Sequence, residues 1–218
     1  MNYKAVIFDF NGTLFFDNDK HVLAWNAISK ILRGHGISDE ELHSKFNGTP
    51  NAKNIQYMKN NQATVAEVQK YSLLKEEYYR KFCQEDQASF HLVPGATSYF
   101  DQLQNMGIPF TIASASIKEN IDFFIESFSL DHWIKPENIV FDDGSYENKV
   151  KMFQEAAKRL NHDVKDILVF EDSFSGIKNA YQAGIDKIIV ICPQEKQGDY
   201  QDLPGVIKVI QDFNDLFD

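Results

Sequence analysis

The chain has 218 residues, 43% of them hydrophobic and 25% charged, which is the composition of a globular protein and not of a disordered one. Its formal net charge of −10 makes it a poor candidate for non-specific nucleic-acid binding, which needs Lys and Arg to neutralise phosphates. No stretch approaches the roughly 20 apolar residues that a membrane helix requires, and the N-terminus lacks the features of a signal peptide. We therefore expect a cytoplasmic protein with no nucleic-acid or membrane partner, in which Cys83 and Cys192 are reduced thiols.

The first predicted element is a short buried strand near the N-terminus. The apolar run of residues 5–8 ends at Asp9 and is followed by the turn signal Asn11-Gly12. A run of β-forming residues that stops at a turn signal is typical of a strand with a tight loop after it.

The next segment, residues 16–90, is predicted to be helical. Its apolar residues recur at helical spacing over residues 22–32 and 65–79, and Gly34 and Gly36 interrupt the pattern between these stretches. Strand signals are few, so we expect residues 16–90 to form an inserted α-helical cap. Residues 1–15 and 91–218 would then form one core domain.

From residue 92 onward, predicted strands and helices alternate. Further apolar runs cover residues 110–113, 139–141, 167–170, 188–191 and 206–210, and helical stripes lie between them. Continuous apolar runs suit strands that are covered on both faces of a parallel sheet. The alternation predicts a doubly wound, Rossmann-like α/β core. Ser116 with Glu119 predicts a capping box at the start of the helix after the second strand.

Polar residues stand where three of these strands end: Asp9, Ser114, and Glu171 with Asp172. The carboxyl ends of parallel strands meet at one edge of a sheet, which is where ligands bind. Converging carboxylates repel one another unless a cation lies between them, and oxygen ligands without His or Cys favour Mg²⁺. A carboxylate beside Mg²⁺ can attack phosphorus and form an aspartyl-phosphate, so Asp9 is the candidate nucleophile.

Three segments carry a resemblance to a known family. Residues 9–14, Asp-Phe-Asn-Gly-Thr-Leu, resemble the first motif of the haloacid dehalogenase superfamily, whose usual form is D-x-D-G-T/V. Residues 112–116, Ile-Ala-Ser-Ala-Ser, resemble its second motif, and residues 170–177 with Ala183-Gly184 resemble its fourth. The segments stand in the expected order at both ends of the predicted core.

The place of the helical insert narrows the resemblance to the β-phosphoglucomutase-like branch. Residues 21–25 are similar to its His-x-x-Ala-Trp segment, Gly48-Thr49 resembles its substrate loop, and Lys75 resembles its cap lysine. The resemblance implies that His21, Trp25, Thr49 and Lys75 contact the substrate. The alternatives are a place in the cap core for Trp25 and a solvated helix surface for Lys75.

The resemblance also implies roles for the core residues. Asp9 would be the nucleophile and a metal ligand, and the backbone carbonyl of Asn11 a second ligand. Asp172 would be a third ligand, and Glu171 would reach the Mg²⁺ directly or through water. Ser114 and the amide of Ala115 would bind the phosphoryl oxygens, and we place Ser116 with them as a substrate-binding residue.

Two departures from the family pattern bear on the expected activity. Asn11 stands where the family usually has an acid/base Asp, and an amide cannot ionise to transfer the proton; such help is worth about 10²–10⁴-fold. The proton could then pass through His21 or water. The third motif lacks its usual proline, and Lys149 is our choice for its lysine, with Lys151 as the alternative.

These observations favour a magnesium-dependent phosphatase that acts on a small phosphorylated metabolite, with a sugar phosphate as the preferred class. A sugar phosphomutase and a ligand-binding pseudoenzyme remain as alternatives, the second because of Asn11. Dehalogenase chemistry ranks last, because Glu171-Asp172 remains and dehalogenases of this superfamily need no metal. We expect a monomer or a weak dimer.

Overall fold

The computed structural model describes residues 3–46 and 48–217 and divides into two compact units. Residues 1–16 and 91–218 form an α/β unit, and residues 17–90 form a helical unit. Across the described ranges, no helix is both long enough and apolar enough to cross a membrane.

The α/β unit is built on one sheet of six parallel strands in the order β3-β2-β1-β4-β5-β6. The strands are β1 (Ala5–Phe8), β2 (Phe110–Ser114), β3 (Val140–Phe141), β4 (Ile167–Glu171), β5 (Ile188–Ile191) and β6 (Val206–Ile210). The ends of each strand lie within two residues of the ends of an apolar run predicted from the sequence. The predicted doubly wound α/β fold is confirmed, and the order reverses direction at β1, where such folds bind ligands.

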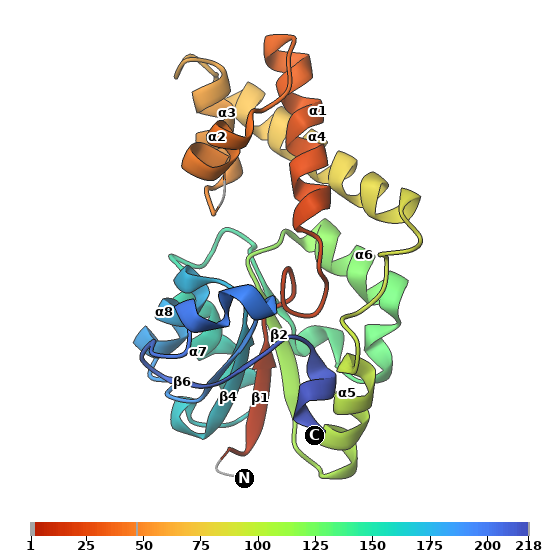
Figure 1. Ribbon diagram of the computed structural model, residues 1–218, viewed down its shortest axis with the longest axis vertical. Coiled ribbons are helices and arrows are strands. Elements are labelled where there is room, and N and C mark those ends of the chain that lie inside the picture. The colour runs from red at the N-terminus through yellow and green to blue at the C-terminus, as the bar shows by residue number, and fades with distance from the viewer. Residues whose placement is uncertain (1–2, 47, 218) are drawn as a thin grey trace. The chain divides into compact units, whose positions relative to one another are not determined.

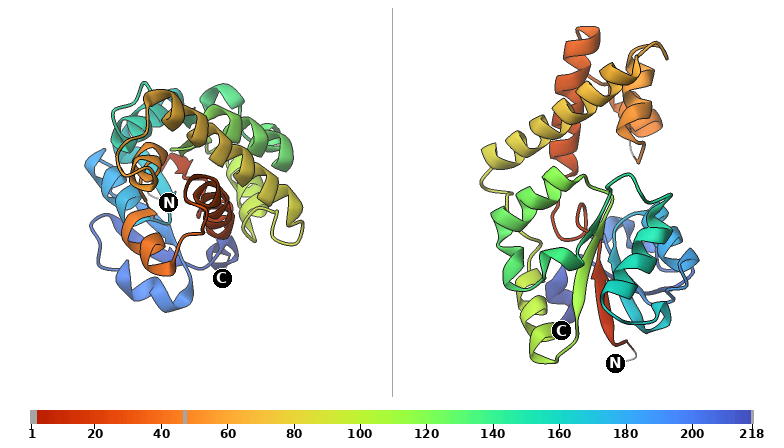
Figure 2. Two further views of the ribbon diagram at one scale, coloured as in Figure 1. Left: turned by 90° about the horizontal axis from the view of Figure 1, so that it is seen from above. Right: turned by 180° about the vertical axis from the view of Figure 1, so that it is seen from behind.

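Helices cover both faces of this sheet (Figure 1 and Figure 2). Successive side chains of a strand point to opposite faces, so Ala5 and Ile7 pack in the cluster beneath α7 (Lys149–Arg159) and α8 (Phe174–Gln182). Phe8 points to the other face, where it stacks on Phe170 and meets Phe100 of α5 (Ala96–Asn105) edge to face. The central strands are therefore buried on both faces, which holds their carboxyl ends in fixed positions.

The helix after β2 begins differently from the prediction. Helix α6 (Lys118–Phe128) has Ile117 at its N-cap, with no side-chain capping bond. The capping box predicted for Ser116 and Glu119 is therefore wrong. The Ser116 hydroxyl is directed elsewhere, because it donates to the Asn11 side chain at 2.7 Å.

The helical unit contains α1 (Asn18–Arg33), α2 (Asp39–Glu41), α3 (Asn51–Met58) and α4 (Val65–Glu85), with a π-helical turn, Leu42–Phe46, after α2. Its hydrophobic core gathers Trp25, Ile28, Phe46, Ile55 and Met58. Helix α1 ends at Gly34, whose φ of 79° is the left-handed conformation that glycine adopts without strain.

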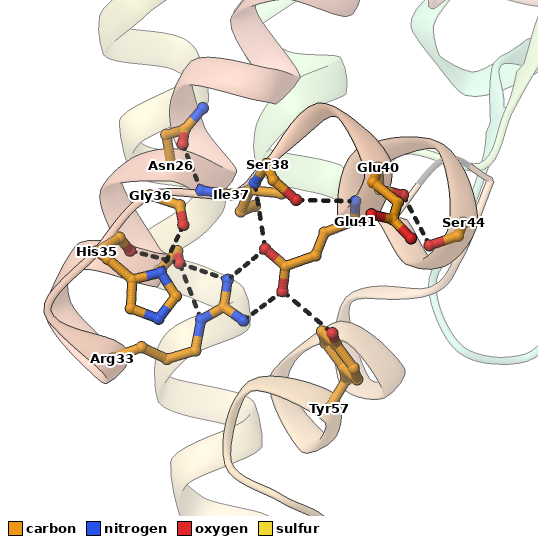
Figure 3. A network of polar contacts seen from close by, with 11 residues as sticks. Asn26, Arg33, His35, Gly36, Ile37, Ser38, Glu40, Glu41, Ser44 and Tyr57 are labelled. Atoms are coloured by element: carbon orange, nitrogen blue, oxygen red, sulfur yellow. Dashed lines mark hydrogen bonds and ion pairs between the residues drawn. The ribbon is translucent and has the colours of Figure 1, made fainter.

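A polar network joins three helices of this unit (Figure 3). The Arg33 guanidinium, on α1, donates to both carboxylate oxygens of Glu41 on α2, at 2.6 and 3.4 Å. The same carboxylate accepts the Ser38 amide at 3.1 Å and the Tyr57 hydroxyl of α3 at 3.1 Å. Such bidentate, charge-assisted bonds fix geometry as well as adding stability.

Candidate active site

Neighbouring strands at the centre of the sheet deliver the polar residues that the sequence singled out. Asp9 follows β1 directly, Ser114 is the last residue of β2, and Glu171 is the last residue of β4. Strands β2 and β4 flank β1 in parallel, so these three residues lie at the same edge of the sheet. The Asp9 amide donates to the carbonyl of Phe170 at 2.9 Å and continues the ladder up to the site.

The Lys149 ammonium joins two of these carboxylates. Its Nζ lies 2.5 Å from Asp9 Oδ1 and 2.5 Å from Glu171 Oε1. Lys149 is the first residue of α7, and the Asn148 side chain caps that helix by accepting the Lys151 amide at 3.3 Å. Lys151 is exposed and its ammonium faces Gln154, so of the two candidate lysines only Lys149 contacts Asp9.

The Glu171 carboxylate is fully buried and held on both oxygens. Oε1 accepts from Lys149, and Oε2 accepts the backbone amides of Asp172 and Ser173 at 3.0 and 3.1 Å and the Ser173 hydroxyl at 3.1 Å. These amides belong to the turn into α8, where unpaired N–H groups and the helix dipole favour an anion. Glu171 thereby fixes Lys149 opposite Asp9.

Burial raises the pKa of Asp9 to about 7; Lys149 opposes this rise, and the neighbouring charge of Glu171 adds to it. Burial by itself would lower the pKa of Lys149, but the Asp9 and Glu171 carboxylates outweigh it and raise that pKa above its ordinary value. The ammonium therefore stays charged. A further cation at this edge would favour the ionised form of Asp9.

The donor set fits a hard divalent cation. Asp9, Glu171 and Asp172 each offer a carboxylate oxygen, and these atoms all lie within 4.8 Å of one another. Oxygen-only ligands of this kind suit Mg²⁺. With Mg²⁺ bound, Asp9 and Asp172 would hold it by their carboxylates, and Glu171 would add a third negative charge beside them.

Two glycines leave room for these carboxylates. A Cβ at Gly12 would collide with the Asp172 carboxylate, and a Cβ at Gly176 would collide with that of Glu171. Gly12 also has a φ of +79°, and its amide closes the loop by donating to the carbonyl of Phe15 at 2.7 Å. The backbone therefore makes space for the acidic groups at the positions where a metal site needs them.

Asn11 and the two serines of the second motif form one contact group. The Asn11 Oδ1 accepts the Ser116 hydroxyl at 2.7 Å and the Ser114 hydroxyl at 3.4 Å. The Ser116 amide donates to Ser114 Oγ at 3.2 Å, and Ala115 between them is exposed. Ser114 itself is buried, beside the end of β1.

The residues predicted in the cap lie within the helical unit, in two settings. Trp25 is buried in its core. The buried Lys75 ammonium bonds His21 Nδ1 at 2.8 Å and Glu76 Oε1 at 2.9 Å, and lies 5.5 Å from the centroid of the Trp25 ring. The alternative that Lys75 lies on a solvated helix surface is therefore wrong, because partners inside the helical unit surround its charge.

Thr49 is partly buried and lies apart from this group. Its amide donates to the carbonyl of Phe46 at 3.1 Å, and its own carbonyl accepts the Asn54 side chain at 3.3 Å. These contacts tie Thr49 to the end of the π-helical turn and to α3.

Sequence reasoning missed Ser173 and Gly176. Ser173 is the N-cap of α8, where its hydroxyl accepts the Gly176 amide at 3.0 Å while also donating to Glu171. A serine ahead of the apolar stripe of Ile177 and Ala180 was an available N-cap signal. The need for glycine at 176 depends on where the Glu171 carboxylate lies, which a linear pattern does not give.

Residues 3–184 match the haloacid dehalogenase-like hydrolase family. The chain belongs to this family. A haloacid dehalogenase-family hydrolase (family IA, variant 3) from Entamoeba histolytica superposes with a TM-score of 0.91 at 32% identity, covering 97% of this chain and 94% of that one. The matched range includes Asp9, Ser114, Lys149 and Asp172. Because relatives of this chain are named as phosphatases, this haloacid dehalogenase-like hydrolase is a phosphatase or phosphotransferase.

Two further relatives have names that describe phosphate chemistry. Validoxylamine A 7′-phosphate phosphatase of Streptomyces hygroscopicus is 26% identical over 197 residues, which is 84% of this chain and 83% of that protein. β-Phosphoglucomutase of Clostridium difficile has a TM-score of 0.76 at 21% identity over 98% of this chain and 93% of that one, a likeness of fold.

Proposed function

We propose that this haloacid dehalogenase-like hydrolase is a magnesium-dependent phosphatase of small phosphorylated metabolites that works through an aspartyl-phosphate on Asp9. The observation that carries the proposal is the ammonium of Lys149, 2.5 Å from Asp9 and 2.5 Å from Glu171, at the edge that also presents Ser114 and Asp172. A cation this close to a nucleophilic carboxylate can stabilise the charge on a transferring phosphoryl group.

The proposed reaction has two steps. An Asp9 carboxylate oxygen attacks phosphorus, and the bond to the leaving oxygen breaks. Lys149, the Ser114 hydroxyl and the amide of Ala115 hold the phosphoryl oxygens during this transfer. Water then attacks the aspartyl-phosphate, which releases phosphate and restores Asp9. Bound Mg²⁺ would supply charge neutralisation between the phosphoryl group and the carboxylates of Asp9 and Asp172.

A sugar phosphate is the substrate class that we favour. One relative is named as the phosphatase of a 7′-phosphate of validoxylamine A, and the fold resembles that of a β-phosphoglucomutase. We further propose that the helical unit acts as a cap whose His21, Thr49 and Lys75 select the substrate.

The test is a panel of phosphorylated sugars incubated with purified protein and Mg²⁺, with both phosphate release and isomer formation followed. We expect phosphate release that Asp9→Asn abolishes and that chelation of Mg²⁺ abolishes. Asp131→Asn, at an exposed position in the segment after α6, is the matched control and should behave as the wild type. Interconversion without release would indicate a mutase, and binding without either would indicate a pseudoenzyme.

A further inference from the structure

The amide at residue 11 limits which leaving groups the site can expel. When an Asp9 oxygen attacks a phosphate ester, the leaving oxygen departs with both electrons of its bond to phosphorus. An alcohol oxygen needs a proton at that moment, and general acids supply it with an advantage of about 10²–10⁴-fold. An Asn side chain has no proton that it can release in this way.

The contacts of Asn11 also engage the proton of a neighbouring hydroxyl group. The Ser116 hydroxyl donates to Asn11 Oδ1 at 2.7 Å, a normal length for an O–H···O bond, and a hydroxyl has only one proton to give. The Ser114 contact is longer, at 3.4 Å, so that hydroxyl is the freer of the two to bind a phosphoryl oxygen. Neither hydroxyl is acidic enough to protonate an alkoxide in place of a carboxylic acid.

The other polar groups at this edge are acceptors or are already committed. The Lys149 ammonium contacts Asp9 and Glu171, and Glu171 accepts four hydrogen bonds. In the exposed loop after β3, Asp142 Oδ1 accepts the Gly144 amide at 3.0 Å, and Asp143 Oδ1 accepts from Ser145. Each of these groups is therefore already engaged in hydrogen bonds or ion pairs at its own loop or strand end.

Of the histidines in the described part of the α/β unit, which are the usual proton donors near neutral pH, two lie at the opposite edge of the sheet. His132 and His162 lie in the connections that lead from α6 to β3 and from α7 to β4, at the amino ends of those strands. The imidazole of His91 is exposed and its Nδ1 contacts the carbonyl of Leu92 at 2.8 Å. Within the part of the α/β unit that the structure describes, the carboxyl edge of the sheet therefore supplies charge and hydrogen-bond donors, and none of the groups named here except the nucleophile Asp9 and His91 offers an acidic proton.

Resting on the phosphatase function proposed above, we infer that the natural substrate carries its phosphate on an oxygen that is stable without a proton. This class comprises acyl phosphates and phosphoanhydrides, and it excludes phosphates of ordinary alcohols. The departing carboxylate or phosphate needs no proton when its bond to phosphorus breaks. The anomeric phosphates of sugars come next, because an anomeric oxyanion is less basic than an ordinary alkoxide and takes its proton from water. Among sugar phosphates, the 1-phosphate is thus favoured over the 6-phosphate.

The test is a series of phosphate monoesters and anhydrides of graded leaving-group pKa, from acetyl phosphate and 4-nitrophenyl phosphate to glucose 1-phosphate and glycerol phosphate. The measured quantity is kcat/KM, which reports the attack of Asp9, because slow breakdown of the aspartyl-phosphate would mask leaving-group effects on kcat. Wild type, Asn11→Asp, Asn11→Ala and Asp9→Asn are compared at saturating Mg²⁺.

We expect kcat/KM of the wild type to fall steeply as the leaving-group pKa rises, and that of Asn11→Asp to fall little. Asn11→Asp should gain about 10²–10⁴-fold on glycerol phosphate and change by less than about tenfold on acetyl phosphate. Asn11→Ala, which has neither an amide nor an acid, should keep the steep dependence of the wild type.

A wild type that hydrolyses glycerol phosphate as readily as acetyl phosphate would overturn the inference and leave the phosphatase function standing. If His21→Asn then made the dependence steep, that histidine would be the acid. No turnover of any compound, with no labelling of Asp9 by acetyl phosphate, would instead overturn the proposed function, and the inference with it.

Discussion

At Gly12 the backbone leaves room for a carboxylate instead of a side chain. A methyl group there would collide with Asp172, which is one of the three carboxylates of the acidic cluster that fits Mg²⁺. We predict that Gly12→Ala weakens Mg²⁺ binding by about 10–100-fold, as for other losses of support around a metal ligand. Titration calorimetry with Mg²⁺, in the presence of a phosphate mimic, measures this.

Gly144→Ala is the control for that substitution. Gly144 has a φ of +80°, close to the +79° of Gly12, so alanine meets the same backbone strain at both positions. Nothing lies within 4 Å of a Cβ at Gly144, so this variant should keep its Mg²⁺ affinity. Equal affinities in the two variants would mean that the position of Asp172 does not govern metal binding.

The choice between Lys149 and Lys151 shows where residue-level prediction from sequence stops. Asp9, Ser114, Glu171 and Asp172 could be grouped in advance, because parallel strands bring their carboxyl ends together. Two residues apart on a helix do not share a face, so the first lysine of α7 contacts Asp9 while the second faces Gln154. The sequence does not reveal which way the first turn of α7 faces.

Among the elements, α2 depends most on its charged partners. It has only three residues and buries none of them, and Glu41 at its end joins α1 and α3 through Arg33 and Tyr57. We predict that Glu41→Gln lowers the free energy of unfolding of the helical unit by about 1 kcal/mol at neutral pH. Urea unfolding followed by the fluorescence of Trp25, in a Trp133→Phe background, measures the difference.

The same variant gives a pH test. Hydrogen bonds from Arg33, above all, lower the pKa of Glu41 from 4.5 to about 2. The unfolded chain therefore takes up a proton at Glu41 below about pH 4.5, before the folded chain does, so the stabilisation is complete above that pH and is lost as the pH falls towards 2. The difference in the free energy of unfolding between wild type and Glu41→Gln should narrow across this window. Glu40→Gln, exposed on the same helix, should unfold with the same free energy as the wild type. A difference for Glu41→Gln that stays constant with pH would contradict the assignment of the stabilisation to the Glu41 carboxylate.

Most elements could be predicted because their hydrophobic pattern is strong. The β1 and β5 runs are apolar without interruption and are buried on both faces of the sheet, so burial and strand propensity agree. The start of α6 was mispredicted because a tertiary partner competes for the serine: the Ser116 hydroxyl bonds Asn11, more than 100 residues earlier in the chain. A local capping signal therefore fails where an acceptor that is far away in the sequence lies close to the serine hydroxyl in space.

At the scale of the whole molecule, each unit has a hydrophobic core of its own and one of the two tryptophans. Trp25 lies in the core of the helical unit, and Trp133 lies in the α/β unit, where it packs against Phe100 and donates to Asp101 at 2.7 Å. The carboxylates that fit Mg²⁺ all belong to the α/β unit. Variants with a single tryptophan therefore report on the two units separately.

We predict that Mg²⁺ stabilises the unit that holds Trp133 and leaves the other unchanged. A ligand that binds only the folded state at 100 times its Kd adds about 2.7 kcal/mol to the free energy of unfolding. The urea midpoint seen by Trp133 in Trp25→Phe should rise accordingly, whereas the midpoint seen by Trp25 in Trp133→Phe should not move. Asp172→Asn should abolish the rise, because it removes a ligand without disturbing either core. If both midpoints rose together, the two cores would unfold as one cooperative unit; if neither rose, the acidic edge of the sheet would not be a magnesium site.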